Sequence, residues 1–311
     1  MSILVAADFT PGEWDAWLPL LSQAMPGEVL LRERDAALAR EIDIAIVANP
    51  PRGALAGFPR LKLVQSLWAG VEGLLADPTL PAGVPLARMV DPAMNEAMAE
   101  TALWAVLSLQ REMFDYARQQ REGRWLQRPQ RTAGETTVAV LGLGQMGRAV
   151  ALRLARNDYR VFGWSARPAA IEGLETRHGD AMLAFVLGAA QIAVNLLPLT
   201  SATRGLFDAR RLALLPRGAS FVNLARGAQV VEADLLAALD SGALRHAVLD
   251  VFAIEPLPAA HPFWAHPKVT LLPHVAAQTD PRSASIVAAA NVAALRAGRA
   301  LQHLVDRERG Y

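Results

Sequence analysis

The stretch VAVLGLGQMGRAVALRLA, residues 138–155, decides the fold. An apolar run comes first, three glycines follow in the spacing GxGxxG, and an apolar pattern at helical spacing comes after them. A strand, a tight turn and a helix in this order let the backbone approach a pyrophosphate, whose charge is favoured at the helix N-terminus. The stretch therefore predicts a Rossmann-type unit that binds a dinucleotide.

Short apolar runs recur on both sides of this stretch. Those before it are ILVAAD, EVLLRE, IAIVANP, LKLVQSL and VPLARM, and those after it are YRVFGW, IAVNLLP, ASFVNLA, HAVLDVF and KVTLLPH. Strands of this length alternating with helical patterns are typical of parallel α/β sheets. Because 311 residues exceed the usual size of one domain, we expect two α/β domains in succession.

Three segments are predicted to be helical or partly helical. Apolar residues from Met94 to Met113 recur near helical spacing and predict one long helix at a domain junction. The last forty residues are alanine-rich and are predicted to be helical from about Asp280. Residues 181–199 are long enough to span a bilayer, but polar residues and a proline within them predict a buried helix followed by a buried strand.

Composition favours a small-molecule ligand. The chain has 31 basic and 30 acidic residues, so no global charge points to nucleic acid or to a membrane surface. It has no cysteine, which excludes disulfides and thiolate metal sites, and no histidine spacing suggests a metal site. The apolar start MSILVAADF lacks the pattern of a signal peptide, and we expect a cytoplasmic protein without a metal.

The second strand of the dinucleotide unit carries the signal for cofactor choice. An NAD site normally has an acidic residue at the end of this strand, where it binds the ribose hydroxyls. Here YRVFGWSARP ends in Trp164, Ser165 and Arg167. Ser165 and Arg167 could bind a 2′-phosphate while Trp164 flanks the adenine, and such a contact gives roughly 10- to 100-fold preference for NADP(H), with NAD(H) still possible.

Three ionisable residues come at or just after the ends of predicted strands. Arg226 follows ASFVNLA, Glu255 ends AVLDVFAIEP, and His274 follows KVTLLP. Ligands of open α/β sheets bind at the carboxyl ends of the strands, so we expect these groups to converge on one crevice. A carboxylate at the end of a buried strand needs a cationic or hydrogen-bonding partner, which the rest of the chain has to supply.

The ordered series GLGQMG, NLLP, NLARG, DVFAIEPLP and PHVAA resembles the D-isomer-specific 2-hydroxyacid dehydrogenase family over nearly the whole chain. Within that family, WAGVEGLL, FGWSARP, VVEADLLAALDSG and VDRERGY look most like the bacterial glyoxylate/hydroxypyruvate reductase A branch. The resemblance implies two doubly wound parallel-sheet domains with the active site in the cleft between them. Residues 1–98 and 281–311 would form a flavodoxin-like outer domain, and residues 99–280 an inserted Rossmann domain.

The resemblance also implies the chemistry. Arg226 would hold the carboxylate of a 2-oxo acid, and protonated His274 would give its proton to the carbonyl oxygen while Glu255 favours and orients the charged ring. The rate of reduction would therefore fall at alkaline pH, and in a Glu255→Gln variant it would fall at a lower pH than in the parent. The implied cofactor-binding residues are Gly142, Gly144, Gln145, Met146, Gly147, Trp164, Ser165, Arg167, Leu197, Pro198, Thr203, Leu224, Ala225, Asp250 and Ala276, with Asp250 facing the nicotinamide amide.

Substrate and partners are implied in the same way. SLWAGVEGL resembles the family's substrate loop, where the N–H groups of Ala69 and Gly70 meet the substrate carboxylate and Trp68 either narrows the pocket or simply packs. Family members are usually dimers, and a long helix near residues 97–116 contributes to their contact. We expect an NADPH-dependent homodimer that reduces glyoxylate and hydroxypyruvate.

Two alternatives stay open at this point. One is a reductase or dehydrogenase for bulkier D-2-hydroxy acids, with apolar walls such as Trp68, Met94, Met98 or Trp264 deciding the size of the pocket. The other is a non-catalytic protein that senses dinucleotides, since function does not follow from fold alone.

Overall fold

The computed structural model describes residues 2–32 and 38–311. The chain divides into two compact units, an outer unit of residues 1–93 and 279–311 and an inserted unit of residues 94–278. The predicted domain boundaries, after Met98 and after Asp280, fall inside one helix and immediately before another.

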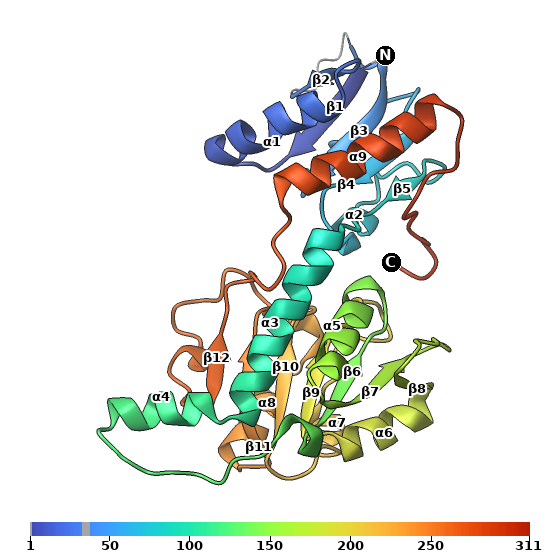
Figure 1. Ribbon diagram of the computed structural model, residues 1–311. Helices are drawn as coiled ribbons and strands as arrows, with labels where there is room; N and C mark the ends of the chain where they lie inside the picture. The colour runs from blue at the N-terminus through green and yellow to red at the C-terminus, as the bar shows by residue number, and fades with distance from the viewer. Residues whose placement is uncertain (1, 33–37) are drawn as a thin grey trace. The chain divides into compact units, whose positions relative to one another are not determined.

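The outer unit is a five-stranded parallel sheet in the order β2-β1-β3-β4-β5 (Figure 1). Its helices α1 and α9 lie side by side, although they come from opposite ends of the chain. This strand order is the flavodoxin-like one, with its reversal between β1 and β3. The elements are β1 Ser2–Ala7, α1 Pro11–Ala24, β2 Val29–Leu31, β3 Ile42–Ala48, β4 Leu63–Ser66, α2 Glu72–Leu75, β5 Leu86–Ala87 and α9 Pro281–Arg296.

The inserted unit is a seven-stranded parallel sheet in the order β12-β11-β10-β9-β6-β7-β8. Its strands are β6 Thr137–Leu141, β7 Arg160–Ser165, β8 Glu175–His178, β9 Ile192–Asn195, β10 Ala219–Asn223, β11 Leu244–Leu249 and β12 Val269–Leu271. Its helices are α3 Pro92–Gln110, whose first two residues belong to the outer unit, α4 Met113–Arg121, α5 Gln145–Arg156, α6 Asp180–Ala189, α7 Ala209–Leu212 and α8 Glu232–Asp240, with short 3-10 helices at Ala133–Glu135, Gly227–Gln229 and Pro262–Trp264.

Both faces of the seven-stranded sheet are buried. Successive residues of a strand point to opposite faces, so Val138 and Val140 pack with α3 and α5, whereas Ala139 and Leu141 pack with α6, α7 and α8. This is why the strands are apolar throughout rather than alternating. The order of the strands reverses between β6 and β9, which puts the glycine loop after β6 at the switch point where such sheets bind ligands.

Two expectations about individual elements are wrong, and one strand has no counterpart in the prediction. The predicted long helix ends at Gln110 because Glu112 is left-handed, with φ 58°, and α4 starts after it. The chain is not helical to its end, since α9 stops at Arg296 and left-handed Gly298 follows. Strand β8 was not predicted, because its residues ETRH form a polar edge strand without an apolar run.

Other expectations hold. The fold class, two parallel-sheet α/β domains, is confirmed. Residues 181–199 contain most of α6 and then buried β9, as predicted, and no helix in the described parts of the chain has the length and apolar character needed to cross a bilayer.

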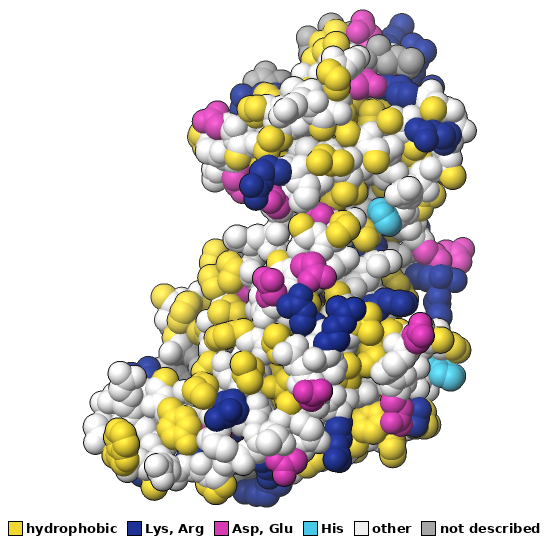
Figure 2. All heavy atoms as spheres, in the orientation of Figure 1, with side chains coloured by type: hydrophobic (Ala, Val, Ile, Leu, Met, Phe, Trp, Pro, Cys, Tyr) yellow, Lys and Arg dark blue, Asp and Glu magenta, His cyan; other side chains and the backbone are white. Residues whose placement is uncertain are grey.

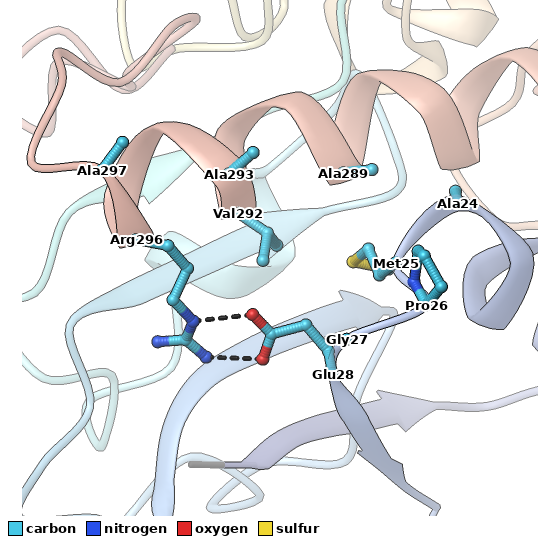
Figure 3. A pocket seen from close by; sticks show the side chains of 10 residues that line it. All are labelled: Ala24, Met25, Pro26, Gly27, Glu28, Ala289, Val292, Ala293, Arg296 and Ala297. Atoms are coloured by element: carbon cyan, nitrogen blue, oxygen red, sulfur yellow. Dashed lines mark hydrogen bonds and ion pairs between the residues drawn. The ribbon is translucent and has the colours of Figure 1, made fainter.

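Ion pairs fasten α9 to the outer sheet. Arg296 Nε donates to Glu28 Oε1 at 2.7 Å and Arg296 Nη2 donates to Glu28 Oε2 at 2.8 Å, in the fork drawn in Figure 3. The same guanidinium also binds Asp43 on β3, whose side chain is almost completely buried. These contacts lie at one end of a shallow pocket between α9 and the segment that follows α1.

Candidate active site

The three glycines of the loop after β6 differ in how much room a side chain would have at each position. Gly142 has φ +100°, and a Cβ there would lie 2.6 Å from the carbonyl oxygen of Leu196. A Cβ on Gly147 would lie 1.7 Å from the oxygen of Gly142, so α5 can pack on the loop only without a side chain there. The first and third glycines are therefore required by the turn and by helix packing.

Neither the turn nor the packing of α5 requires a glycine at position 144. It is exposed, and a Cβ there would meet no protein atom within 4 Å. It directly precedes α5, whose N-terminus has no side-chain cap. A free helix N-terminus flanked by a residue without a side chain suits the close approach of an anion such as a pyrophosphate, so these residues fit a dinucleotide. Gln145 and Met146 open the helix beside it.

Two of the three residues expected to contact the nucleotide near the end of β7, Ser165 and Arg167, are at least partly exposed. The Ser165 hydroxyl donates to the carbonyl oxygen of Arg167 at 2.6 Å, and the Arg167 side chain is exposed. Trp164 departs from the prediction. It is 3% exposed, packs in the core with Leu183 and Leu187, and donates from Nε1 to Gly179 O, so its ring cannot flank an adenine. Its carbonyl instead accepts from the N–H of Gly142.

Most of the other residues expected to bind the cofactor have buried side chains, which leaves their backbone groups for contact with a ligand. The side chains of Leu197, Leu224, Ala225 and Ala276 are buried in the inserted unit. Thr203 acts on its own loop, where its Oγ1 donates to Pro198 O at 2.6 Å and accepts from Thr200 N at 2.8 Å. Thr203 therefore holds the Pro198 segment in shape.

Arg226 lies three residues beyond β10, at the carboxyl end of the sheet. It is partly buried, and its Nη1 donates to the carbonyl oxygen of Ala225 at 2.7 Å. Gly227 follows it and approaches the next loop closely, because a Cβ there would lie 1.8 Å from the carbonyl carbon of Phe252. The turn that carries Arg226 thus rests directly on the loop that follows β11.

Glu255 and His274 form the pair that the sequence predicts. Glu255 Oε2 lies 2.7 Å from His274 Nδ1, and Glu255 Oε1 accepts from the N–H of Phe252 at 2.8 Å. The two side chains are 34% and 50% exposed, so a small molecule can reach the imidazole. With Nδ1 engaged by the carboxylate, Nε2 is the nitrogen available to a ligand.

The position of Glu255 along the chain corrects the sequence prediction. β11 ends at Leu249, and Glu255 is in the loop beyond it rather than at the lip of the strand. The apolar run AVLDVFAI continues past the strand because Val251 and Phe252 are buried in the loop as well. The apolar run predicts a longer strand than the structure has, because buried loop residues and buried strand residues are equally apolar.

Asp250 is buried at the end of β11 and holds the backbone of the loop after β12. It is 1% exposed, and its two carboxylate oxygens accept from Val275 N at 2.7 Å and from Ala276 N at 3.0 Å. Its carbonyl oxygen accepts from His274 N at 2.9 Å. Burial raises the pKa of Asp250, and the two N–H donors partly oppose that rise. The residue therefore clamps the turn that carries His274, whose φ is 55°.

The predicted substrate loop belongs to the outer unit, and Trp68, Ala69 and Gly70 are all partly buried there. Trp68 packs in an aromatic cluster with Phe9 and Trp17, at ring distances of 6.3 and 5.8 Å. The structure therefore shows that Trp68 packs within the outer unit. Met94 and Met98, named as possible walls for a bulkier substrate, are buried.

Some residues were missed. His178 pairs in register with Ser165 because β8 runs beside β7, and three buried amides, Asn195, Asn223 and Gln229, lie behind the loops after β9 and β10. A single sequence carries no signal for them, since an unpredicted edge strand and buried side-chain amides leave no periodic pattern. Across residues 2–32 and 38–311, no group of three histidine or carboxylate side chains could hold a metal ion.

Comparison with known proteins agrees with this geometry. Residues 103–276 match the family model described as D-isomer specific 2-hydroxyacid dehydrogenase, NAD binding domain. A glyoxylate/hydroxypyruvate reductase A from Serratia proteamaculans is 41% identical over 302 residues, covering 96% of each chain, and one from Yersinia enterocolitica is 39% identical over 95% of this chain and 96% of its own.

Solved structures agree as well. A D-isomer specific 2-hydroxyacid dehydrogenase from Xanthobacter autotrophicus, in complex with NADPH and MES, is 43% identical and aligns over 100% of this chain and 99% of its own with a TM-score of 0.94. An NADPH-dependent glyoxylate/hydroxypyruvate reductase from Sinorhizobium meliloti, in complex with NADP and sulfate, is 36% identical over 100% of both chains with a TM-score of 0.92. The family membership predicted from the motifs is thereby confirmed: this chain belongs to the D-isomer-specific 2-hydroxyacid dehydrogenase family of NAD(P)-dependent oxidoreductases.

Proposed function

We propose that the protein is an NADPH-dependent reductase of small 2-oxo acids, with glyoxylate and hydroxypyruvate as first substrates and glycolate and D-glycerate as products. The observation that carries the proposal is the 2.7 Å contact of Glu255 with His274, in a loop next to the turn that holds Arg226. The names of the relatives support the same substrates.

In this proposal each residue has a distinct task. Arg226 binds the substrate carboxylate through its guanidinium. His274 donates a proton from Nε2 to the carbonyl oxygen, while Glu255 contacts Nδ1 and holds the orientation of the ring. The reduced nicotinamide nucleotide, when bound, supplies the hydride that the carbonyl carbon accepts. Hydride and proton together convert the 2-oxo acid to the 2-hydroxy acid.

The glycine loop and the end of β7 would hold the nucleotide. Gly144 and the N-terminus of α5 suit its pyrophosphate. Ser165 and Arg167 would bind a 2′-phosphate, because the chain offers no acid at the end of β7 to compete for ribose hydroxyls. His178 lies beside Ser165 and adds a further hydrogen-bonding group there.

A homodimer is part of the proposal. Large apolar side chains of α3, α4 and the segment after α4 are exposed, and Figure 2 shows hydrophobic side chains over that region of the inserted unit. These residues are Trp104, Leu107, Met113, Trp125, which is 96% exposed, and Leu126. Exposed apolar patches of this kind mark protein contacts. The proposed location is the cytoplasm, which suits a chain without cysteine.

The first experiment measures initial rates with glyoxylate and hydroxypyruvate, each with NADPH and with NADH. We expect turnover with about tenfold or greater preference for NADPH, which an Arg167→Ala variant loses. Turnover that favours NADH would keep the reductase and reject the phosphate site. If neither substrate is reduced, larger 2-oxo acids come next, and failure of all of them would favour a protein that only senses dinucleotides.

The role of the pair is tested by Glu255→Gln. The glutamine keeps the length of the side chain but has one oxygen where the carboxylate has two, so it cannot accept from both the N–H of Phe252 and His274 Nδ1. The ring then loses its fixed orientation, and kcat should fall. Asp240→Asn is a suitable control, since Asp240 contacts a different histidine, His266, at 3.1 Å. A kcat of the Glu255→Gln variant equal to that of the parent would contradict the assignment.

A further inference from the structure

Three side-chain amides are buried behind the loops that carry Arg226 and the Leu197–Pro198 segment. Asn195 ends β9, Asn223 ends β10 and Gln229 closes the 3-10 helix after Arg226; they are 0%, 1% and 0% exposed. Asn195 Nδ2 donates to Asn223 Oδ1 at 3.0 Å and to Gln229 Oε1 at 2.7 Å. The three amides therefore form one connected network.

Gln229 uses its whole hydrogen-bonding capacity in this network. Its Nε2 donates to Leu197 O and to Pro198 O, both at 3.0 Å. Its Oε1 accepts from Asn195 Nδ2 and, at 3.3 Å, from the N–H of Arg226. A glutamine amide has two donors and two acceptor positions, so one buried side chain contacts both loops with nothing left unpaired.

Asn223 and Asn195 complete the two ends of the network. Asn223 Nδ2 donates to Arg226 O at 3.1 Å, and its Oδ1 accepts from Ala225 N at 3.2 Å. Asn195 Oδ1 accepts from Leu197 N at 3.2 Å. The backbone of Arg226 is thus held at both its N–H and its carbonyl, by Gln229 and Asn223 respectively.

We propose that Gln229 is a positioning residue, whose amide fixes the backbone of Arg226 and ties it to the Leu197–Pro198 loop, so that dinucleotide binding and 2-oxo acid binding depend on the same buried contact. The inference rests on the proposed function, in which Arg226 binds the substrate carboxylate, and on the expectation from the family resemblance that Leu197 and Pro198 contact the cofactor. Since interior amides are costly to leave unpaired, neither loop can shift without breaking bonds of the other.

Two isosteric substitutions separate the two ties. Gln229→Glu places an oxygen where Nε2 faces Leu197 O and Pro198 O, and we expect about tenfold or greater rises in both the Kd for NADPH and the KM for glyoxylate. Asn223→Asp places an oxygen only against Arg226 O, so the KM should rise by a similar factor while the Kd for NADPH stays within about twofold.

The matched control is Gln191→Glu. Gln191 belongs to the same sheet, but its Oε1 accepts from Thr137 N at 2.8 Å where β6 and β9 begin, at the opposite edge from the loops. Its substitution should leave both constants within about twofold of the parent. Gln229→Met, which has the length of glutamine without its amide, is measured in parallel with Gln191→Met in case a buried acid prevents folding, and the same two rises are expected.

The outcomes are distinct. Folded Gln229 variants whose KM and Kd match those of the Gln191 controls, whatever their thermal stability, would overturn the inference and leave a purely structural network. A raised KM with unchanged NADPH affinity would overturn the tie between the loops. The Kd is measured by NADPH fluorescence without turnover, so a parent protein that binds NADPH but reduces no 2-oxo acid signals failure of the proposed function instead.

Discussion

At the scale of single residues, the loops after β10, β11 and β12 are held by contacts that leave little room for change. Gly227 touches the backbone of Phe252, whose N–H in turn binds Glu255, and Glu255 binds His274. Arg226, the neighbour of Gly227, is held by buried amides. Such a chain of contacts explains how half-exposed side chains keep one orientation.

Gly227→Ala should disturb this chain at its tightest point. The added methyl group would overlap the carbonyl carbon of Phe252, so we expect a loss of about 1–3 kcal/mol in the free energy of unfolding and a fall in kcat/KM. Urea unfolding and steady-state kinetics measure the two effects. Gly188→Ala is the control, because a Cβ there lies 3.8 Å from Leu214 O and alanine favours helix α6; equal behaviour of both variants would refute the tight approach.

Asp250→Asn should separate activity from stability. An asparagine cannot accept from both Val275 N and Ala276 N, so the His274 turn shifts and kcat falls by about a hundredfold. Because burial raises the pKa of Asp250, the folded protein holds that proton more tightly than the unfolded chain, and stability falls as pH rises through this interval. The neutral side chain removes that penalty, so the free energy of unfolding at neutral pH should change little; a large loss of stability with unchanged kcat would contradict this account.

At the scale of elements, β11 and α4 meet at a buried histidine. His246 stacks on Phe114 of α4 at 4.7 Å, and its Nε2 lies 2.9 Å from Thr270 Oγ1. Burial lowers the pKa of His246 to about 4. The folded protein therefore favours the neutral imidazole at this contact between α4 and the sheet.

The pH dependence of stability should follow from this histidine. The pKa of His246 is lower in the folded protein than in the unfolded chain. As pH falls from about 6.5 toward 4, the unfolded chain therefore binds a proton at His246 that the folded protein does not bind. The free energy of unfolding falls by up to about 3 kcal/mol over this range. His246→Gln should reduce the loss measured by urea unfolding between about pH 7 and about pH 5. His178→Gln, at an exposed position, serves as the control. An undiminished loss in the His246→Gln protein would count against the assignment.

At the scale of the whole molecule, the chain leaves the outer unit and returns to it, so the last helix must find the sheet formed by the first strands. Arg296 makes that connection through Glu28 and Asp43. Side-chain hydrogen bonds from both carboxylates raise the pKa of Arg296, which keeps the guanidinium charged. The contact joins segments more than 250 positions apart in sequence.

Arg296→Met should destabilise the outer unit. Removing the cation leaves the buried Asp43 carboxylate uncompensated, and loss of one partner of such a pair costs about 3–5 kcal/mol. Thermal unfolding followed by circular dichroism measures the effect, with exposed Arg299→Met as the control. A melting profile like that of the control would show that the ion pairs do not hold α9.

The sequence by itself determined the α/β class, the glycine loop, the family and the pairing of Glu255 with His274, because strand and helix periodicity and motif order are local properties of the chain. Tertiary structure alone decided that Trp164 is buried, that Asp250 clamps a turn, that polar β8 is a strand and that Gln229 contacts two loops. The reason is physical. Burial and hydrogen-bond partners depend on segments distant in sequence. The local sequence around a tryptophan, an aspartate or a glutamine therefore does not show whether its side chain faces a ligand or the core.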